Sequence, residues 1–222
     1  MCYRYTLKSL AVVESFYAAL AEQLDESAVA GWQPRYNVAL TNPMPVITRR
    51  PALTLETMRF GFVLPPRPPA GKPMILANAR AETLLAKPAF REGARHRRCL
   101  VPADGFYEWE KKGAERLPHY FTLSDRRPFF FAGIWEPARD DTPAAFCIVT
   151  TTANALLQPI HDRLPVMLGP NSGPAWLGDQ PLDPALLARL CRPLPADVMT
   201  GCRVDPRVNS VRQEGPDCIV PV

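Results

Sequence analysis

The stretch Arg-Cys-Leu-Val-Pro-Ala-Asp-Gly-Phe-Tyr-Glu-Trp, residues 98–109, is the part of the chain that best predicts the fold class. Strand-like residues stand on both sides of an Asp104-Gly105 pair, which is typical of a turn. Because side chains alternate along a strand, Glu108 shares a face with the aromatic Phe106. An apolar setting raises the pKa of a carboxyl group, so Glu108 is a candidate general acid or base. The alternative is a glutamate on an edge strand that faces water.

Short strands predominate on either side of this stretch. The further strand-like runs are 36–40, 44–47, 53–63 with a break near Gly61, 119–123, 129–135, 146–151 and an apolar tail at 219–222. Helical spacing predicts helices over 9–24 with Ser9 as N-cap, 81–86, 174–177 and 184–191. The 26 prolines interrupt long helices and central strands, and a dense group lies in a surface loop expected over 64–72. We therefore expect one strand-rich α+β domain over residues 1–222.

The composition limits the classes of protein that the chain belongs to. The net charge of +4 is compatible with nucleic-acid binding, but the arginines near 49–50 and 91–98 are equally consistent with a solvated face. The chain shows no signal-peptide pattern and no apolar run long enough to span a membrane. The six cysteines include no Cys-x-x-Cys pair, so we expect reduced thiols in the cytoplasm. His96 and Cys99 have metal-site spacing without a second pair, and no phosphate-binding loop is found, so we expect no metal and no cofactor.

Cys2 stands directly behind the initiator methionine. If Met1 is removed, one residue carries both a free α-amine and a thiol. The amine of such an aminothiol condenses with an aldehyde, and the thiol then closes on the imine carbon to give a thiazolidine ring. The second step is intramolecular and gains the advantage of proximity. The alternative is a cysteine without function at a frayed terminus.

Two further short polar segments, around Asn78 and around His161, stand between apolar parts of the sequence. Asn78 and Arg80 lie in a strand-to-helix connection, where the amide offers a donor and an acceptor and the guanidinium suits phosphate. The alternative is local capping with Arg80 paired to Glu82. His161 precedes Asp162 between two apolar segments, and histidine titrates near neutral pH. The alternative is a turn histidine paired with Asp162.

Taken together, these segments resemble the SRAP family, the abasic-site processing proteins first described as SOS-response-associated peptidases. The likeness runs nearly end to end. It is carried by Met1-Cys2 with Arg4, residues 35–39, Asn78-Ala79-Arg80 with Glu82-Thr83, residues 99–105 leading to Glu108-Trp109, and residues 160–163 with Pro165-Val166. The resemblance implies a mainly antiparallel, barrel-like sheet with short peripheral helices.

The resemblance also implies a reaction. After removal of Met1, Cys2 would trap the ring-opened aldehyde of an abasic site in single-stranded DNA as a thiazolidine. Asn78 would hold the residue and help sense the sugar, Glu108 would handle protons, and His161 would act on the sugar hydroxyl during ring opening. Family members also show lyase activity and slow reversal of the crosslink, and the peptidase label refers to release of the residue ahead of Cys2.

The implied partner is therefore single-stranded DNA that contains abasic sites, bound by a monomer without any membrane association. The expected DNA contacts are Arg4, Asn37, Phe60, Arg80 and Arg163.

Three departures from the family pattern bear on these contacts. The glycine that usually follows the nucleophile is Tyr3, a bulky residue that either crowds the approach or supplies a stacking ring. A Trp-Gly pair of the family appears as Phe60-Gly61, and a second nearby tryptophan is absent. The proline that usually follows residues 37–39 is Leu40.

Two other functions remain open at this point. One is a cysteine peptidase that uses Cys2 and His161 on other polypeptides. The other is a non-catalytic single-strand DNA-binding module, whose binding would be salt-sensitive and indifferent to abasic sites.

Overall fold

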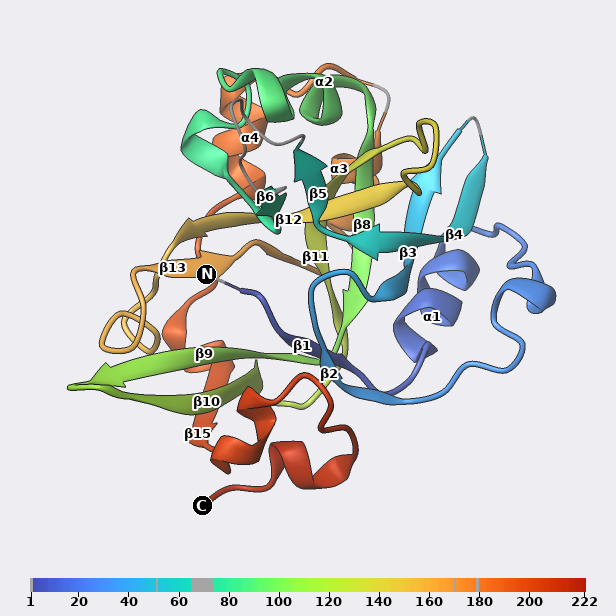
Figure 1. The fold of residues 1–222 in the computed structure, drawn as a ribbon. Helices are drawn as coiled ribbons and strands as arrows, with labels where there is room; N and C mark the ends of the chain where they lie inside the picture. Colours follow the sequence, from blue (N-terminus) through green and yellow to red (C-terminus); the bar gives the residue numbers. More distant parts are fainter. Residues whose placement is uncertain (1, 51, 65–73, 170, 179) are drawn as a thin grey trace.

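A closed ring of strands forms the centre of the fold in the computed structural model, which describes all residues except 1, 51, 65–73, 170 and 179 (Figure 1). Within the described residues the ring joins β12 (Ala145–Thr152), β4 (Leu53–Phe60), β3 (Pro43–Arg49), β8 (Arg98–Ala103) and β11 (Phe129–Glu136), and β11 pairs again with β12. The β12–β4 pairing is parallel and the other four are antiparallel. The expected strand-rich α+β fold with a barrel-like sheet is confirmed.

Three short strands extend this ring: β7 (Asn78–Arg80), β13 (Arg163–Pro165) and β14 (Met167–Leu168). The first is parallel to β12, and the second is antiparallel to it. Residue Thr150 of β12 faces Arg80 on one side and Pro165 on the other, so these two strands lie on opposite edges of β12. This arrangement brings two sequence motifs to the same place although some 80 residues separate them.

A second, open sheet lies beside the ring, at the lower left of Figure 1. Its order is β15 (Met199–Arg203), β10 (Glu115–Leu123), β9 (Gly105–Lys112), β1 (Tyr5–Leu7) and β2 (Arg35–Val38), and every pairing is antiparallel. A small hairpin-like sheet pairs β5 (Phe62–Leu64) with β6 (Met74–Leu76). The loop expected over 64–72 lies, apart from Leu64, outside the described residues.

Short helices lie around the sheets. They are α1 (Ala11–Ala19), α2 (Pro88–His96), α3 (Gly173–Leu177) and α4 (Pro184–Leu190), with 3-10 turns η1 (Glu26–Ala28), η2 (Ala81–Thr83), η3 (Ala196–Val198), η4 (Pro206–Asn209) and η5 (Pro216–Ile219). The first helix is shorter than expected and starts after Leu10 without a side-chain cap, so Ser9 is not its N-cap. The predicted helix over 81–86 is a single 3-10 turn. The apolar tail is not a strand: η5 is followed by one bridge between Val204 and Pro221.

The turn at Asp104 carries the chain from the ring into the second sheet. Only Asp104 separates β8 from β9, and its buried carboxylate accepts hydrogen bonds from the Thr6 hydroxyl and the Lys8 backbone N–H. Gly105 follows because a Cβ there would lie 2.2 Å from the hydroxyl oxygen of Tyr120. A buried carboxylate is stable only with such donors, so this network fixes the angle between the two sheets.

Phe60 is part of the core. Its ring is fully buried and stacks on Phe146 with 5.2 Å between ring centroids. The Tyr5 ring packs against it in a T-shaped arrangement with 5.6 Å between centroids. Gly61, with φ of 103°, then turns the chain at the end of β4. The expectation that Phe60 borders DNA does not match this placement, because the strand alternation points its side chain into the ring.

We expect Phe60→Ala to lower the free energy of unfolding by about 3–5 kcal/mol, as for other buried aromatic side chains. Urea denaturation followed by circular dichroism measures this change. The control is Val211→Ala, since Val211 is 63% exposed and its loss should change stability by no more than about 0.5 kcal/mol. Equal stabilities for the two variants would contradict the core assignment.

Candidate active site

Cys2 lies at the base of the site and is almost fully buried, with 1% of its surface exposed. The Asn78 side chain donates a hydrogen bond from Nδ2 to the backbone oxygen of Cys2, at 3.1 Å. The Cys2 thiol lies 3.7 Å from the backbone oxygen of Arg4. Asn78 begins β7, which is held along β12, so the pairing with β12 positions the amide that binds the Cys2 backbone.

Glu108 is the second buried ionisable group of the site, with 2% of its surface exposed. It lies on β9 on the same face as Phe106, as the alternation of the strand predicts. Burial raises the pKa of Glu108. A positive charge on the His161 ring acts in the opposite direction and lowers this pKa. A carboxyl group with a raised pKa exchanges protons closer to neutral pH, which is what a general acid or base requires.

The Cys2 thiol and the Glu108 carboxyl are electrostatically coupled. Burial raises the pKa of Cys2, and negative charge on Glu108 raises it further. The thiol is therefore protonated at neutral pH, and two adjacent negative charges are disfavoured. A reaction at sulfur must move the thiol proton as the new bond forms, and Glu108 is the neighbouring group able to take it.

His161 completes the cluster from the opposite edge of β12. Its Nδ1 accepts a hydrogen bond from the backbone N–H of Arg163 at 2.9 Å. Nδ1 also lies 3.0 Å from a carboxylate oxygen of Asp162, whose side chain is 78% exposed. In the neutral imidazole, the hydrogen bond from the Arg163 backbone requires the proton on Nε2, whereas the Asp162 contact favours a proton on Nδ1. The structure thus brings Cys2, Asn78, Glu108 and His161 together.

The basic residues expected to contact DNA fall into two groups. Arg80 is exposed at the end of β7 and is available to a ligand. Arg163 is only 7% exposed, and its guanidinium binds both carboxylate oxygens of Glu82 at 2.8 Å and the backbone oxygen of Thr150 at 2.8 Å. Glu82 is therefore paired with Arg163 and not with Arg80.

Arg4 and Asn37 hold a C-terminal segment against the amino-terminal segment, in which Cys2 precedes β1. The Arg4 guanidinium donates to the backbone oxygens of Val208 at 2.9 Å and Asn209 at 3.1 Å and to the side-chain oxygen of Asn37. The buried Asn37 amide donates to Val208 and to the backbone oxygens of Ser210 and Gln213. Asn37 is buried and Arg4 is partly buried, and together they tie the amino-terminal and carboxy-terminal segments to each other.

The role of residues 206–214 was missed by the sequence reasoning. Glu214 accepts hydrogen bonds from the backbone N–H groups of Tyr36 and Asn37 and from Arg35. Asn209 accepts from the indole N–H of Trp109 at 2.6 Å, next to Glu108. No local pattern marks this segment, and the only sequence signal was the polar Arg4 and Asn37, whose partners lie far along the chain.

Tyr3 is exposed beside the buried Cys2, with 39% of its surface accessible. It is followed by Arg4, whose guanidinium carbon lies 6.0 Å from the ring centroid of Trp109. With Phe60 in the core, Tyr3 is the aromatic ring adjacent to the nucleophile that an incoming base is able to meet.

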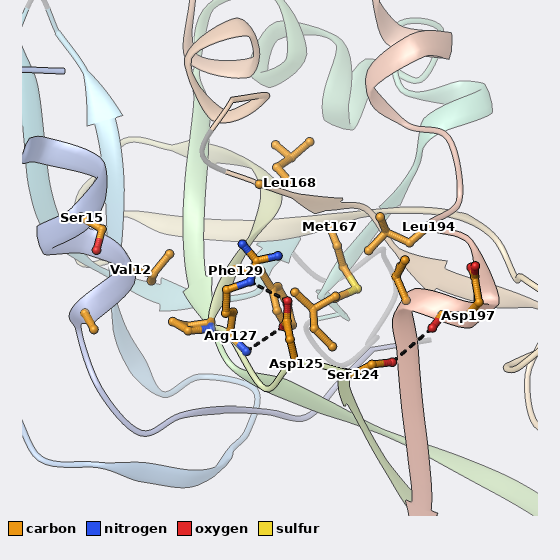
Figure 2. A pocket seen from close by; sticks show the side chains of 15 residues that line it. Val12, Ser15, Ser124, Asp125, Arg127, Phe129, Met167, Leu168, Leu194 and Asp197 are labelled. Carbon is orange, nitrogen blue, oxygen red and sulfur yellow. Dashed lines mark hydrogen bonds and ion pairs between the residues drawn. The ribbon is translucent and has the colours of Figure 1, made fainter. Parts of the chain in front are cut away.

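A cavity of about 710 Å³ lies apart from this cluster (Figure 2). Its walls are largely apolar and include Val12 and Phe129, and an Asp125–Arg127 ion pair lies among its lining residues. None of the four clustered side chains lines it. Among the described residues, no group of three or more metal-ligating side chains comes together, and no helix of that part of the chain is long and apolar enough to cross a membrane.

Comparisons with known proteins match this chain over nearly its whole length. A family model described as SOS response associated peptidase (SRAP) matches residues 1–211. The Abasic site processing protein YoqW of Bacillus subtilis is 34% identical, with 99% of each chain covered. The Abasic site processing protein YedK of Escherichia coli is 30% identical over 94% of this chain and 95% of its own. A solved protein of Bacteroides thetaiotaomicron shares the fold, with a TM-score of 0.79, 24% identity and full coverage of both chains.

The raised pKa of Glu108 predicts a pH-dependent effect of Glu108→Gln on stability. Below the unfolded-state pKa of about 4.3 the carboxyl is protonated in both states, so burial imposes no ionisation penalty there. Stability is then lost as the pH rises through the higher folded-state pKa. Glu108→Gln should therefore be more stable relative to wild type at pH 8 than at pH 4, by about 1.4 kcal/mol for each unit of pKa elevation.

Urea denaturation at several pH values measures this difference. The control is Glu115→Gln, because Glu115 is exposed at the start of β10. A stability difference between Glu108→Gln and wild type that does not change with pH would contradict the raised pKa.

Proposed function

The chain belongs to the SOS response associated peptidase (SRAP) family, and from this premise we propose that it processes abasic sites in DNA through a covalent bond to Cys2. The relatives named abasic site processing proteins support the substrate. The observation that carries the mechanism is the cluster of Cys2, Asn78, Glu108 and His161 around one N-terminal residue. The finer steps follow from the chemistry of these groups.

The covalent step joins an aldehyde to an aminothiol. Once Met1 is removed, the Cys2 α-amine adds to the open-chain aldehyde of the abasic sugar, and loss of one water gives an imine. The thiol then adds to the imine carbon, its proton passes to the nitrogen, and a thiazolidine results. The balance is one aldehyde and one aminothiol giving one ring and one water, with no oxidant or metal required. Because the thiol and amine share a residue, ring closure is intramolecular.

Glu108 is the proton carrier of this sequence. Its raised pKa allows the carboxyl group to donate a proton to the departing hydroxyl during imine formation. The resulting carboxylate is then placed to accept the thiol proton as sulfur attacks. The same group would serve in the reverse direction, and in lyase chemistry that begins from the imine.

His161 and Asn78 act on the sugar and on the nucleophile respectively. The neutral imidazole presents an N–H at Nε2 because Nδ1 accepts from the Arg163 backbone, so Nε2 is the donor for a sugar oxygen during ring opening. Asn78 fixes the backbone oxygen of Cys2, which limits the rotation of the reacting residue.

The DNA contacts that we propose centre on exposed groups. Arg80 provides a phosphate contact beside the site, and Tyr3 provides a ring on which an exposed base can stack. Arg4, Asn37 and Arg163 support the site from within. We further propose that the ligand is single-stranded, that the protein acts as a monomer, and that it works in the cytoplasm.

We expect Cys2→Ala to abolish a protein–DNA adduct that survives denaturation. The assay incubates the protein, after mass spectrometry has established loss of Met1, with single-stranded DNA carrying one abasic site, and separates products on a denaturing gel. The adduct mass should equal protein plus DNA minus one water. Cys202→Ser is the matched control, because Cys202 is a free, partly exposed thiol on β15. Equal crosslinking by Cys2→Ala, or none by the wild type, would refute the proposal.

We expect Arg80→Gln to weaken binding to single-stranded DNA and to reduce the slope of log affinity against log salt by about 0.7, the value for one lost phosphate contact. Fluorescence anisotropy over a salt series measures both quantities. Arg127→Gln is the control, since Arg127 is 75% exposed beside the separate cavity. An equal slope for Arg80→Gln and wild type would remove Arg80 from the interface.

A further inference from the structure

The pair formed by Glu82 and Arg163 is a geometrically complete ion pair next to the site. Each of the two terminal guanidinium nitrogens of Arg163 lies 2.8 Å from its own Glu82 carboxylate oxygen. The Arg163 side chain is 8% exposed and that of Glu82 is 48% exposed. A bidentate ion pair of this kind fixes the relative orientation of the two side chains as well as their distance, because the planar guanidinium and carboxylate groups must be coplanar to form both hydrogen bonds.

This pair crosses β12. Glu82 lies in η2, two residues after β7 ends, whereas Arg163 begins β13 on the opposite edge of β12. The same guanidinium also donates to the backbone oxygen of Thr150 between them. The ion pair therefore joins η2, the turn that follows β7, to β13 on the opposite edge of β12.

Each partner of the pair is close in sequence to a residue of the site. Asn78, which anchors Cys2, lies four residues before Glu82. His161 lies two residues before Arg163, and its Nδ1 accepts from the Arg163 backbone N–H. Holding the Arg163 side chain thus also holds the backbone donor that selects the tautomer of His161.

The charge on Glu82 suits this arrangement. The hydrogen bonds from Arg163 lower the pKa of Glu82, so its carboxylate stays ionised at neutral pH. Arg80 and Asp162 are the other charged groups nearby in the chain. Arg80 adds a smaller effect of the same sign on Glu82, and Asp162 is directed to His161.

We propose that Glu82 is a positioning residue, which through Arg163 sets the placement and tautomer of His161 relative to Asn78 and Cys2. This inference rests on the proposed function, since it assigns Glu82 a part in the same reaction. Glu82 itself touches no reacting atom. Its effect is exerted on the rate of the covalent step and on the protonation site of His161.

The test substitutes Glu82→Gln, which keeps the shape and removes the charge. The maximal rate of adduct formation at saturating abasic DNA should fall at least about 10-fold, because small misplacements of reacting groups cost that much. The half-saturating DNA concentration should stay unchanged. Long-range ¹H–¹⁵N correlation spectra, with His161 assigned from a His161→Gln variant, should show loss of the uniform Nε2–H tautomer.

Two further variants complete the test. Arg163→Lys keeps a cation but loses the fork, and should reproduce both effects if Glu82→Gln fails to fold. Glu92→Gln is the matched control, because Glu92 forms an exposed pair with Arg95 at 4.0 Å on α2, and it should change neither quantity.

The outcomes separate this inference from the proposed function. A wild-type tautomer and rate in Glu82→Gln would overturn the inference even if Cys2 forms its adduct. Tighter DNA binding at an unchanged rate would do so as well, since it would mean that Glu82 only screens Arg163 from phosphate. Failure of the wild type to form any Cys2-dependent adduct would refute the proposed function, while the tautomer measurement would still decide the role of Glu82.

Discussion

Hydrogen bonding of β12 along both of its edges is the constraint on which the rest of this structure depends. One edge takes β4 and then β7, and the other takes β11 and then β13. The pairings with β4 and β11 close the ring. The pairings with β7 and β13 hold Asn78 and the strand that follows His161. The same strand thus completes the barrel and spaces the candidate catalytic groups. Because a one-residue slip of a strand turns every side chain to the other face, the register of β12 determines which groups meet.

Burial gives the site its chemistry. A thiol and a carboxyl group that would each be ordinary in water are placed where burial disfavours their ionisation, and negative charge on Glu108 raises the pKa of the Cys2 thiol further. Such a pair favours concerted movement of a proton over a free thiolate. It also protects the cysteine from oxidation, which requires an accessible thiolate. In the proposed reaction, reactivity would then depend on delivery of an aldehyde to the Cys2 amine, because the buried, protonated sulfur is a poor nucleophile.

Local patterns in the sequence were sufficient for much of the fold. They marked Cys2, Asn78, Glu108 and His161 only as candidates with open alternatives, and the family resemblance joined these residues into one site. The alternation around Glu108 correctly placed it beside Phe106, and the turn at Asp104 correctly marked the end of β8. The partners of Arg4, Asn37 and Arg163 were not predictable, because each lies on a segment remote in sequence and the chemistry of arginine fits a phosphate as well as a carboxylate or a carbonyl. Phe60 was expected at the DNA site because it stands at the position of the family's Trp-Gly pair, and that position does not tell whether the side chain is exposed or, as here, buried. The extent of α1 and of the tail depended on tertiary packing, which local propensity does not contain.

The contacts that hold the amino-terminal segment also determine when during synthesis this segment can dock. Arg4 binds backbone oxygens 204 and 205 residues further along the chain, and the anchor of Cys2 lies 76 residues away. A ribosome produces the amino end first and these partners much later, so the amino-terminal segment has no complete docking place until almost the entire chain has emerged. The amino end is therefore accessible while translation continues, and folding afterwards encloses the Cys2 thiol. Under the proposed function, removal of Met1 would fall in the first of these periods and burial of the thiol in the second.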